Sequence, residues 1–197
     1  MIVKIQGEDF EFDAGTASAE EILGRVNAEL EKTNQLVGSM VIDGVEVFNN
    51  HLAYINEKIE SIRDIEVKPA TKHEIAMENV DLIGRYMESA IPSLSKVAED
   101  FRTGVTEEGW LLFESIVKGL IFIEGLNGDI LGMLLSYDNK EVIRIWGKVI
   151  EEYRKLNDML KDLEEFLDHD QTEQAADMVE YKMKPILERV LSLIGEI

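Results

Sequence analysis

The stretch Ile65-Glu-Val-Lys-Pro-Ala-Thr-Lys-His-Glu74 contains the change of pattern that decides the fold. Before it, short runs such as Ile2-Val-Lys-Ile5 and Val45-Glu-Val47 are set among turn residues and read as strands. After it, apolar residues recur every three or four positions almost to the C-terminus. A period of two is typical of half-buried strands and a period of 3.6 of amphipathic helices. The sequence therefore predicts an α+β protein, with a small mixed domain over residues 1–69 and a helical domain over residues 70–197.

Turn and capping signals give the order of elements in the first domain. Gly7-Glu-Asp9 separates the first two strand-like runs and Asp43-Gly44 separates the next two, so each pair is predicted to form a hairpin. Between the hairpins, Ser18-Ala-Glu-Glu21 forms a capping box that begins a helix. A short helix over residues 52–62 and a last strand, Ile65–Val67, complete the order.

This order of hairpin, helix, hairpin, short helix and strand resembles the ubiquitin-like β-grasp fold. The resemblance is one of topology and length, over about seventy residues. It implies a domain that docks partners through its sheet face or pairs an edge strand with a partner strand. The last strand runs into Lys68-Pro-Ala70 and not into a free Gly-Gly tail, so the conjugation chemistry of ubiquitin-like proteins is not expected.

Four capping signals predict four helices in the second domain. They are Thr71-Lys-His-Glu74, Thr106 with two glutamates after it, Asp138-Asn-Lys-Glu141 and Asp170-Gln-Thr-Glu173. Within each helix the apolar residues alternate steps of three and four, the pattern of a bundle core. The connections are short, so consecutive helices are expected to be antiparallel neighbours. The prediction is an antiparallel up-down-up-down four-helix bundle.

The second of these helices, over residues 106–135, is apolar nearly all round. Its core positions are expected at Leu112, Ile116, Gly119, Ile123, Leu126, Ile130 and Met133. A helix that is apolar on every side must be buried on more than one side. The additional cover is expected from the first domain, a second copy of the chain or another protein. The residues expected to bind a partner are Trp110, Phe113, Val117, Phe122, Leu131 and Leu134.

The same helix is rich in glycine, at Gly119, Gly125, Gly128 and Gly132. Each glycine within a helix costs about 1 kcal/mol relative to alanine. That cost is explained if another backbone approaches the helix closely at these positions. The alternative is that Asn127-Gly128-Asp129 breaks the helix.

Two prolines fall inside predicted helices. Pro92 lies in the first and Pro185 in the fourth, and each removes a hydrogen bond and is expected to kink its helix. A kink can wrap the bundle around its core or open a groove for a ligand.

No spacing of residues indicates an active site or a metal centre. A ferritin-like di-iron site needs Glu-x-x-His motifs, but the residues three positions before the histidines are Phe48, Ala70 and Phe166. The sequence contains neither a Gly-x-x-x-x-Gly-Lys-Ser/Thr loop nor a Gly-x-Ser-x-Gly elbow. It contains no cysteine, so a thiolate nucleophile or metal ligand is excluded. We therefore expect a protein that is not an enzyme and uses no metal or cofactor.

The charge of the chain limits its partners. Its 40 acidic and 20 basic residues give a formal net charge of −20. Nucleic-acid backbones and anionic membranes bind cationic patches, so neither is expected as a partner. The most apolar segment, Trp110–Leu135, is interrupted by four charged residues, and the N-terminus lacks the pattern of a secretory signal. A cytoplasmic location is expected.

These observations predict a cytoplasmic protein-interaction module: an adaptor, a chaperone or a regulatory subunit. It would bind a protein partner, or itself as a homodimer, through the apolar second helix of the bundle. At the level of fold, such a short antiparallel bundle resembles bacterial flagellar and secretion chaperones, which mask an amphipathic helix of their client. The alternative is a small-molecule- or metal-responsive module with a pocket between the domains or at a kinked helix.

Overall fold

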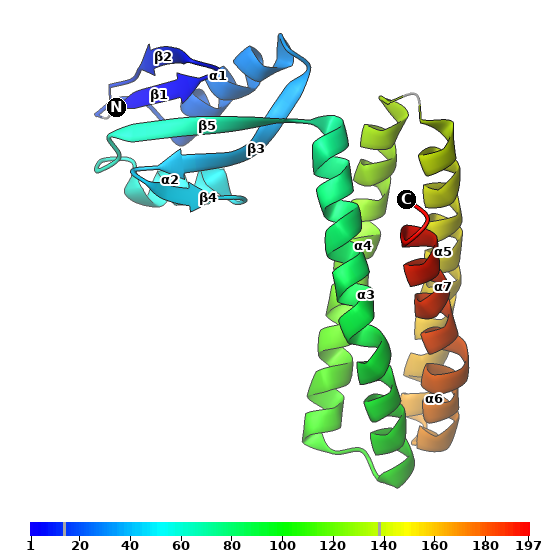
Figure 1. The fold of residues 1–197 in the computed structure, drawn as a ribbon. Coiled ribbons are helices and arrows are strands. Elements are labelled where there is room, and N and C mark those ends of the chain that lie inside the picture. Colours follow the sequence, from blue (N-terminus) through cyan, green and yellow to red (C-terminus); the bar gives the residue numbers. More distant parts are fainter. Residues whose placement is uncertain (14, 138) are drawn as a thin grey trace. The chain divides into compact units, whose positions relative to one another are not determined.

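The computed structural model describes residues 1–13, 15–137 and 139–197, and it divides the chain into two compact units (Figure 1). The first unit, Met1–Ile75, holds a mixed β-sheet with helices, and the second, Ala76–Ile197, is helical. The α+β class expected from the sequence is confirmed. Among the residues that the structure describes, no helix combines the length and the apolar character that crossing a membrane requires.

The sheet of the first unit has the order β2-β1-β5-β3-β4. Strands β1 and β5 are parallel, and the other neighbours are antiparallel. The elements are β1 (Ile2–Ile5), β2 (Glu8–Glu11), α1 (Ala19–Glu31), β3 (Gln35–Ile42), β4 (Val45–Val47), α2 (His51–Lys58) and β5 (Asp64–Thr71). Both predicted hairpins are present, but the first turn is not at Gly7-Glu-Asp9 as predicted, because Glu8 and Asp9 already pair with β1. Their two-residue turns, Gln6-Gly7 and Asp43-Gly44, have positive φ at both residues, as turns that match the twist of a hairpin require.

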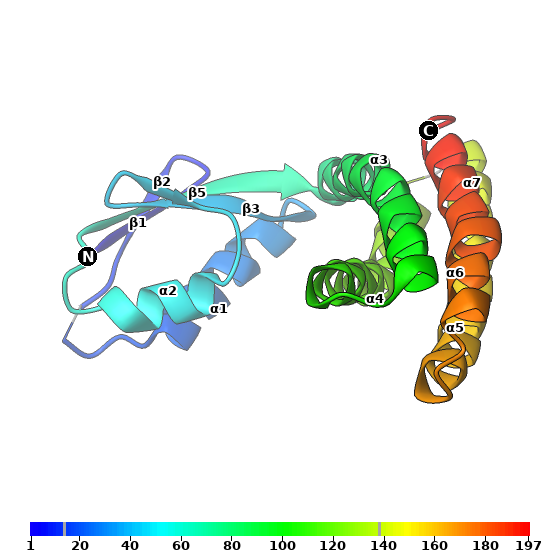
Figure 2. The ribbon, with the colours of Figure 1, turned by 90° about the horizontal axis from the view of Figure 1, so that it is seen from below.

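The core of the first unit lies between the sheet and its helices. Figure 2 shows α1 and α2 on the same side of the sheet. Ile22, Val26 and Leu30, four residues apart on α1, are fully buried in this core. The Ser18 side chain accepts a hydrogen bond of 3.1 Å from the Glu21 N–H, which fixes the predicted start of the helix.

Strand β5 is longer than the predicted Ile65–Val67 and includes Pro69. Beyond Val67, β5 has no β1 partner, so the missing N–H of Pro69 does not interrupt a ladder on that side. On the other side the ladder to β3 shifts register at Gly38. A Cβ at Gly38 would lie only 2.9 Å from the Ala70 Cβ, so a glycine is required at this irregularity. Lys68-Pro-Ala70, which the prediction placed after the end of the strand, therefore belong to β5.

The second unit consists of long helices that share one hydrophobic core. They are α3 (Lys72–Thr103), which begins in the first unit, α4 (Glu107–Leu135), α5 (Lys140–Asp168), α6 (Thr172–Met178), the π-helix η1 (Val179–Met183) and α7 (Lys184–Ile194). Helix α4 is continuous, so Asn127-Gly128-Asp129 does not break it. The fourth predicted helix is divided into α6, η1 and α7, which follow one another without a loop.

The starts of α3 and α4 follow the predicted capping signals. The Thr71 N–H donates to the Glu74 carboxylate over 2.7 Å, and the Glu74 N–H donates to the Thr71 hydroxyl over 3.1 Å. These backbone and hydroxyl hydrogen bonds hold the pKa of Glu74 below its usual value. At α4, the Thr106 hydroxyl accepts from the Gly109 N–H, and the Asp100 carboxylate accepts from both the N–H and the hydroxyl of Thr106. Aspartate and hydroxyl groups satisfy N–H groups that a helix start leaves without a partner.

The two remaining starts differ from the prediction. Asp138 lies outside the described residues, and the side chain that caps α5 is Asn139, which accepts from the Val142 N–H over 3.3 Å. Helix α6 begins after Gln171, without a side-chain cap, and Asp170 has a positive φ in the preceding turn. Asp170 is therefore part of the turn and not a cap.

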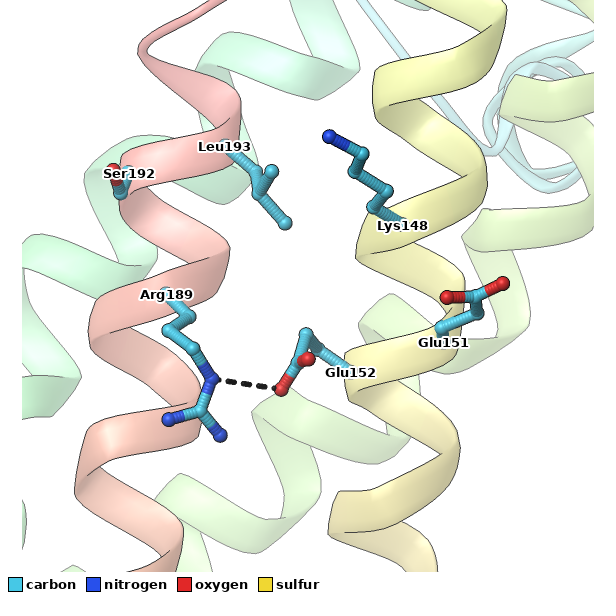
Figure 3. Close-up of a pocket in the computed structure, with 6 residues that line it drawn as sticks. All are labelled: Lys148, Glu151, Glu152, Arg189, Ser192 and Leu193. Atoms are coloured by element: carbon cyan, nitrogen blue, oxygen red, sulfur yellow. Dashed lines mark hydrogen bonds and ion pairs between the residues drawn. The ribbon is translucent and has the colours of Figure 1, made fainter.

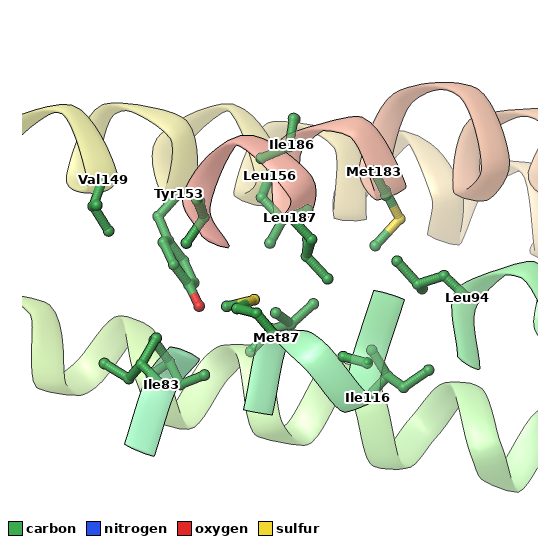
Figure 4. Packing of buried hydrophobic residues seen from close by; sticks show 14 of the residues in the cluster. Ile83, Met87, Leu94, Ile116, Val149, Tyr153, Leu156, Met183, Ile186 and Leu187 are labelled. Carbon is green, nitrogen blue, oxygen red and sulfur yellow. The ribbon is translucent and has the colours of Figure 1, made fainter. Parts of the chain in front are cut away.

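Aromatic and aliphatic side chains from its helices form the core of the second unit (Figure 4). Trp146 of α5 is fully buried, and its indole N–H donates to the Asn127 carbonyl oxygen of α4 over 3.2 Å. Figure 4 shows Tyr153 of α5 pointing toward Ile83 and Met87 of α3. Burial raises the pKa of Tyr153 above its ordinary value. Trp146 and Tyr153 are therefore core residues.

Both prolines lie at or near helix irregularities. Helix α3 continues through Pro92, and Figure 2 shows that its axis changes direction along its length. Pro185 is the second residue of α7 and follows the π-helix, in which the Lys184 N–H donates to the Val179 carbonyl. A proline crowds the carbonyl four residues earlier and donates no hydrogen bond, and the wider π turn accommodates both effects.

Candidate functional site

Helix α4 packs into the core along one line of residues. This line contains Gly109, Phe113, Ile116, Leu120, Ile123, Asn127, Ile130 and Leu134, at alternating steps of four and three. It is displaced by about one position from the predicted line, of which only Ile116, Ile123 and Ile130 are buried. Because α4 is apolar nearly all round, the sequence pattern did not determine which of its sides faces the core.

The side of α4 away from this line is largely apolar and open to solvent. Five bulky side chains on the helix are between 43% and 63% exposed: Trp110, Leu111, Ile121, Phe122 and Leu135. We define the outer face of α4 as the residues opposite the buried line at 100° per residue. The outer face consists of Leu111, Glu114, Ser115, Lys118, Ile121, Phe122, Gly125, Gly128, Asp129, Gly132 and Leu135.

The six residues expected to bind a partner are divided between three environments. Trp110 and Phe122 are exposed, and Val117 and Leu131 are half-buried. Phe113 and Leu134 belong to the core, with 7% and 2% of their surface exposed. The expectation that Leu134 binds a partner is therefore corrected, whereas Phe113 also lines the groove described below. Phe113 packs its ring edge-on against Phe101 of α3, with ring centroids 5.5 Å apart.

Sequence reasoning omitted three exposed residues of the outer face. These are Leu111, Ile121 and Leu135. The signal that could have identified them is their spacing, because they fall in register with Gly125, Gly128 and Gly132 at helical steps of three and four.

The glycines of α4 are explained in two different ways. A Cβ at Gly119 would lie 2.1 Å from the Tyr86 hydroxyl oxygen, so this glycine makes room for a side chain of α3. The Tyr86 hydroxyl donates to the Ile116 carbonyl over 2.8 Å, and burial raises the pKa of Tyr86. By contrast, a Cβ at Gly125, Gly128 or Gly132 would meet no atom within 4 Å. Three glycines thus cost about 3 kcal/mol of helix stability without a reason inside the described chain.

A groove lies beside the outer face, between α4 and α5. It has a volume of about 470 Å³ and is lined mainly by apolar side chains, among them Trp110, Phe113, Val117, Leu160 and Leu167. Its charged lining consists of Lys161, Glu164 and Asp168 of α5. We refer to it as the α4–α5 groove. Ile121 belongs both to this groove and to the outer face, so the two form one continuous surface.

Most residues that line a second groove, between α5 and α7, are charged (Figure 3). Across it the Arg189 Nε donates to the Glu152 carboxylate over 3.0 Å. Burial opposes the charge of Glu152, but hydrogen bonds from Lys155 and Arg189 outweigh it and hold the pKa of Glu152 below its usual value. These charged groups therefore neutralise one another within the chain.

A cluster of polar side chains, separate from both grooves, lies near the two prolines. The Lys184 ammonium donates to the Ser95 hydroxyl over 2.7 Å and to the Glu180 carboxylate over 3.1 Å. It joins α3 to the π-helix, and its members are largely withdrawn from solvent. Among the described residues, no three histidine, aspartate or glutamate side chains gather in a way that could hold a metal ion.

Family models match both units of the chain. Residues 78–192 match the model described as a domain of unknown function, DUF8042, and this match includes all of α4. Residues 1–71 match the model of the TP0873 N-terminal domain. No curated protein and no solved structure matches the chain.

Proposed function

The chain belongs to the DUF8042 family, and we propose that it is a non-enzymatic protein-interaction module that binds a helical segment through α4. The observation that carries this proposal is that α4 leaves five bulky apolar side chains exposed, of which Trp110 and Ile121 also line the α4–α5 groove. Single exposed apolar residues are common on proteins, whereas a continuous apolar surface bordered by polar residues marks a binding surface.

The chemistry of the surface favours a helix as the bound element. The α4–α5 groove and the outer face run along helices, and an amphipathic helix places its apolar side chains into such a groove at steps of three and four. Gly125, Gly128 and Gly132 leave the α4 backbone uncovered, so a second helix can approach it closely. Interaxial distances between packed helices depend on the size of the side chains at the contact.

We infer that both units have folds suited to this role. The sheet order β2-β1-β5-β3-β4, with its parallel pair β1 and β5, supports a β-grasp domain. If the uninterrupted run of α6, η1 and α7 is counted as one rod, then α3, α4 and α5 complete a four-helix bundle around a single core. In such a bundle, α4 would bind the partner of an adaptor or chaperone, because α4 leaves bulky apolar side chains exposed on its outer face.

The alternative of a ligand-responsive pocket at a kinked helix receives less support. Near the prolines, Ser95, Glu180 and Lys184 satisfy one another by hydrogen bonds and an ion pair. A ligand at this place would have to replace these interactions, whereas a partner on the outer face of α4 would cover apolar surface that is now in water.

Site-specific photo-crosslinking in cells of the native organism tests the proposal. A photoreactive phenylalanine is placed at Phe122 on the outer face and, as a matched control, at Tyr181, which is equally exposed but lies on the π-helix. We expect discrete protein adducts at position 122 and few at position 181, and we expect Gly128→Gln to suppress them by filling the glycine surface. Equal or absent adducts at the two positions would contradict the proposed function.

A further inference from the structure

We propose that the partner of the outer face is a second copy of this chain, with the two α4 helices packed antiparallel about a twofold axis near Ile123. This inference rests on the proposed function and specifies its partner. It follows from three features of the outer face: its repeat, the distribution of large and small residues along it, and the placement of its charges.

The outer face carries a regular seven-residue repeat of its own. Its central residues are Leu111, Glu114, Lys118, Ile121, Gly125, Gly128, Gly132 and Leu135, at alternating steps of three and four. Such spacing keeps one line of residues facing a partner helix along its whole length. From Leu111 to Leu135 the line spans about 36 Å at 1.5 Å per residue. Helix α4 therefore has two such lines on opposite sides. Among the described residues, the inner line is buried by the other helices, whereas most of the outer line is exposed.

Large and small residues are distributed unequally along this line. Its N-terminal half holds Glu114, Lys118 and Ile121, and its C-terminal half holds Gly125, Gly128 and Gly132. In an antiparallel pair the N-terminal half of one helix faces the C-terminal half of the other. A twofold axis near Ile123 places each large residue opposite a glycine and each terminal leucine opposite a leucine. The facing pairs are Leu111 with Leu135, Glu114 with Gly132, Lys118 with Gly128, and Ile121 with Gly125.

Other arrangements do not produce this fit. In a parallel, in-register pair, Glu114 would face Glu114 and Lys118 would face Lys118, so this bulky half would hold the helices apart and leave a void between the facing glycines. Voids forfeit the packing contacts that stabilise an interface. A foreign helix could match the line only by repeating the same reversed order of large and small residues. The reversed sequence of α4 supplies that order, so a second copy of the chain fits the outer face.

The charges of the outer face fit the same register. Lys118 forms an ion pair of 2.7 Å with Glu114 on its own helix. In the antiparallel pair, Lys118 faces Gly128 of the second copy and therefore lies beside Asp129 of that copy. The axis repeats this contact, so each dimer gains two Lys118–Asp129 pairs. In a chain of net charge −20, such pairs offset part of the repulsion between copies at the contact itself.

Sedimentation velocity of the purified full-length chain, over a range of concentrations, tests the assembly. We expect a monomer–dimer equilibrium that Gly128→Leu shifts to monomer, because the added side chain occupies the place of Lys118 of the second copy. Gly24→Leu is the matched control: Gly24 is also an exposed helical glycine with open space around it, but it lies on α1. A chain that stays monomeric at all concentrations, or a Gly128→Leu variant that dimerises like the control, would overturn the inference.

A charge exchange between two variants tests the register without relying on loss of folding. In a dimer of the Lys118→Glu variant, the new glutamate would lie beside Asp129 of the other copy, so two acids would repel each other. In a dimer of the Asp129→Lys variant, the new lysine would lie beside Lys118 of the other copy, so two bases would repel each other. Each variant alone should therefore dimerise about tenfold more weakly. Mixing the two variants should restore dimers, because each mixed pair again joins opposite charges at both contacts. If the mixture behaves as the sum of its components, the antiparallel register is wrong.

The crosslinking experiment separates this inference from the proposed function. An adduct at position 122 with twice the mass of the chain supports both. An adduct with a different protein only would sustain the proposed function and overturn the second copy as partner.

Discussion

Helices α4 and α5 have the same length and pack into the same core, yet their outward sides differ in kind. Each spans 29 residues, and each buries one side against its neighbours. The outward side of α5 carries mainly charged residues, including Glu151, Arg154, Asp158 and Lys161. The outward side of α4 carries exposed leucine, isoleucine, phenylalanine and glycine residues beside a few charged ones such as Glu114 and Lys118. Burial of one side accounts for the composition of α5. In α4, burial explains the apolar residues on the inner side only. An interaction on the outer face explains the exposed apolar residues and the glycines on the other side.

The largest expected effect comes from truncating one aromatic residue on each helix. Trp146→Ala on α5 should lower the free energy of unfolding by about 3–5 kcal/mol, because it removes a fully buried side chain and its hydrogen bond to Asn127. Phe122→Ala on α4 should change it by no more than about 0.5 kcal/mol at concentrations where the chain is monomeric. Urea unfolding of both variants measures this difference. A loss of several kcal/mol for Phe122→Ala would show that the outer face is already buried in the monomer.

Two glycines of α4 should respond to the same substitution with opposite signs. Gly119→Ala should destabilise the chain by about 1–3 kcal/mol, because the new methyl group would collide with the Tyr86 hydroxyl. Gly128→Ala should stabilise the monomer by up to about 1 kcal/mol, because alanine is the better helix former and the position is open. Thermal or denaturant unfolding at low concentration checks both. Destabilisation by Gly128→Ala would mean that another part of the chain covers this glycine.

The starts of the two helices should differ in strength. Thr106→Ala at α4 should cost about 1–2 kcal/mol, because Thr106 both caps Gly109 and receives support from Asp100. Asn139→Ala at α5 should cost about 0.5–1 kcal/mol, because its one capping hydrogen bond is long at 3.3 Å. Equal costs in unfolding experiments would contradict this order.

The smallest expected effect is a pH dependence that comes from α5. The pKa of Glu152 is held below its unfolded value by Lys155 and Arg189, so its contribution to stability is present at neutral pH and disappears as the pH falls through the folded pKa. Glu152→Gln should remove this part of the acid-dependent loss. An NMR titration of the Glu152 carboxyl checks the premise, and a pKa at or above 4.5 would refute it.

Most of the order of elements could be predicted from local sequence signals. Asp43-Gly44 and the box at Thr71–Glu74 determine a turn and a helix start through their own hydrogen bonds and dihedral angles, and both are present. The last strand was predicted to end at Val67, before Pro69, but it continues to Thr71. Whether a strand can include a proline depends on which neighbours the strand has. The division of the last helix by a π-helix at Val179–Met183 likewise depends on packing around Pro185.

The candidate site could be predicted only in part, for a physical reason. The helix that carries it was identified, since a helix that is apolar nearly all round needs more cover than one core provides. The side of the helix that faces the core could not be determined, because apolar residues occur on every side and the spacing alone does not favour one of them. Phe113 and Leu134 were therefore assigned to the surface, and Leu111 and Ile121 were overlooked.

Disulfide crosslinking between introduced cysteines tests the central claim most directly, because the chain contains no cysteine of its own. The claim is that the outer face of α4 pairs antiparallel with the outer face of a second copy. Leu111→Cys and Leu135→Cys are prepared as separate variants and oxidised alone and as an equal mixture. We predict covalent dimers in the mixture and little crosslinking of either variant alone, because each position faces the other in the second copy and lies about 36 Å from its own equivalent. Crosslinking of each variant with itself, or none in the mixture, would contradict the account.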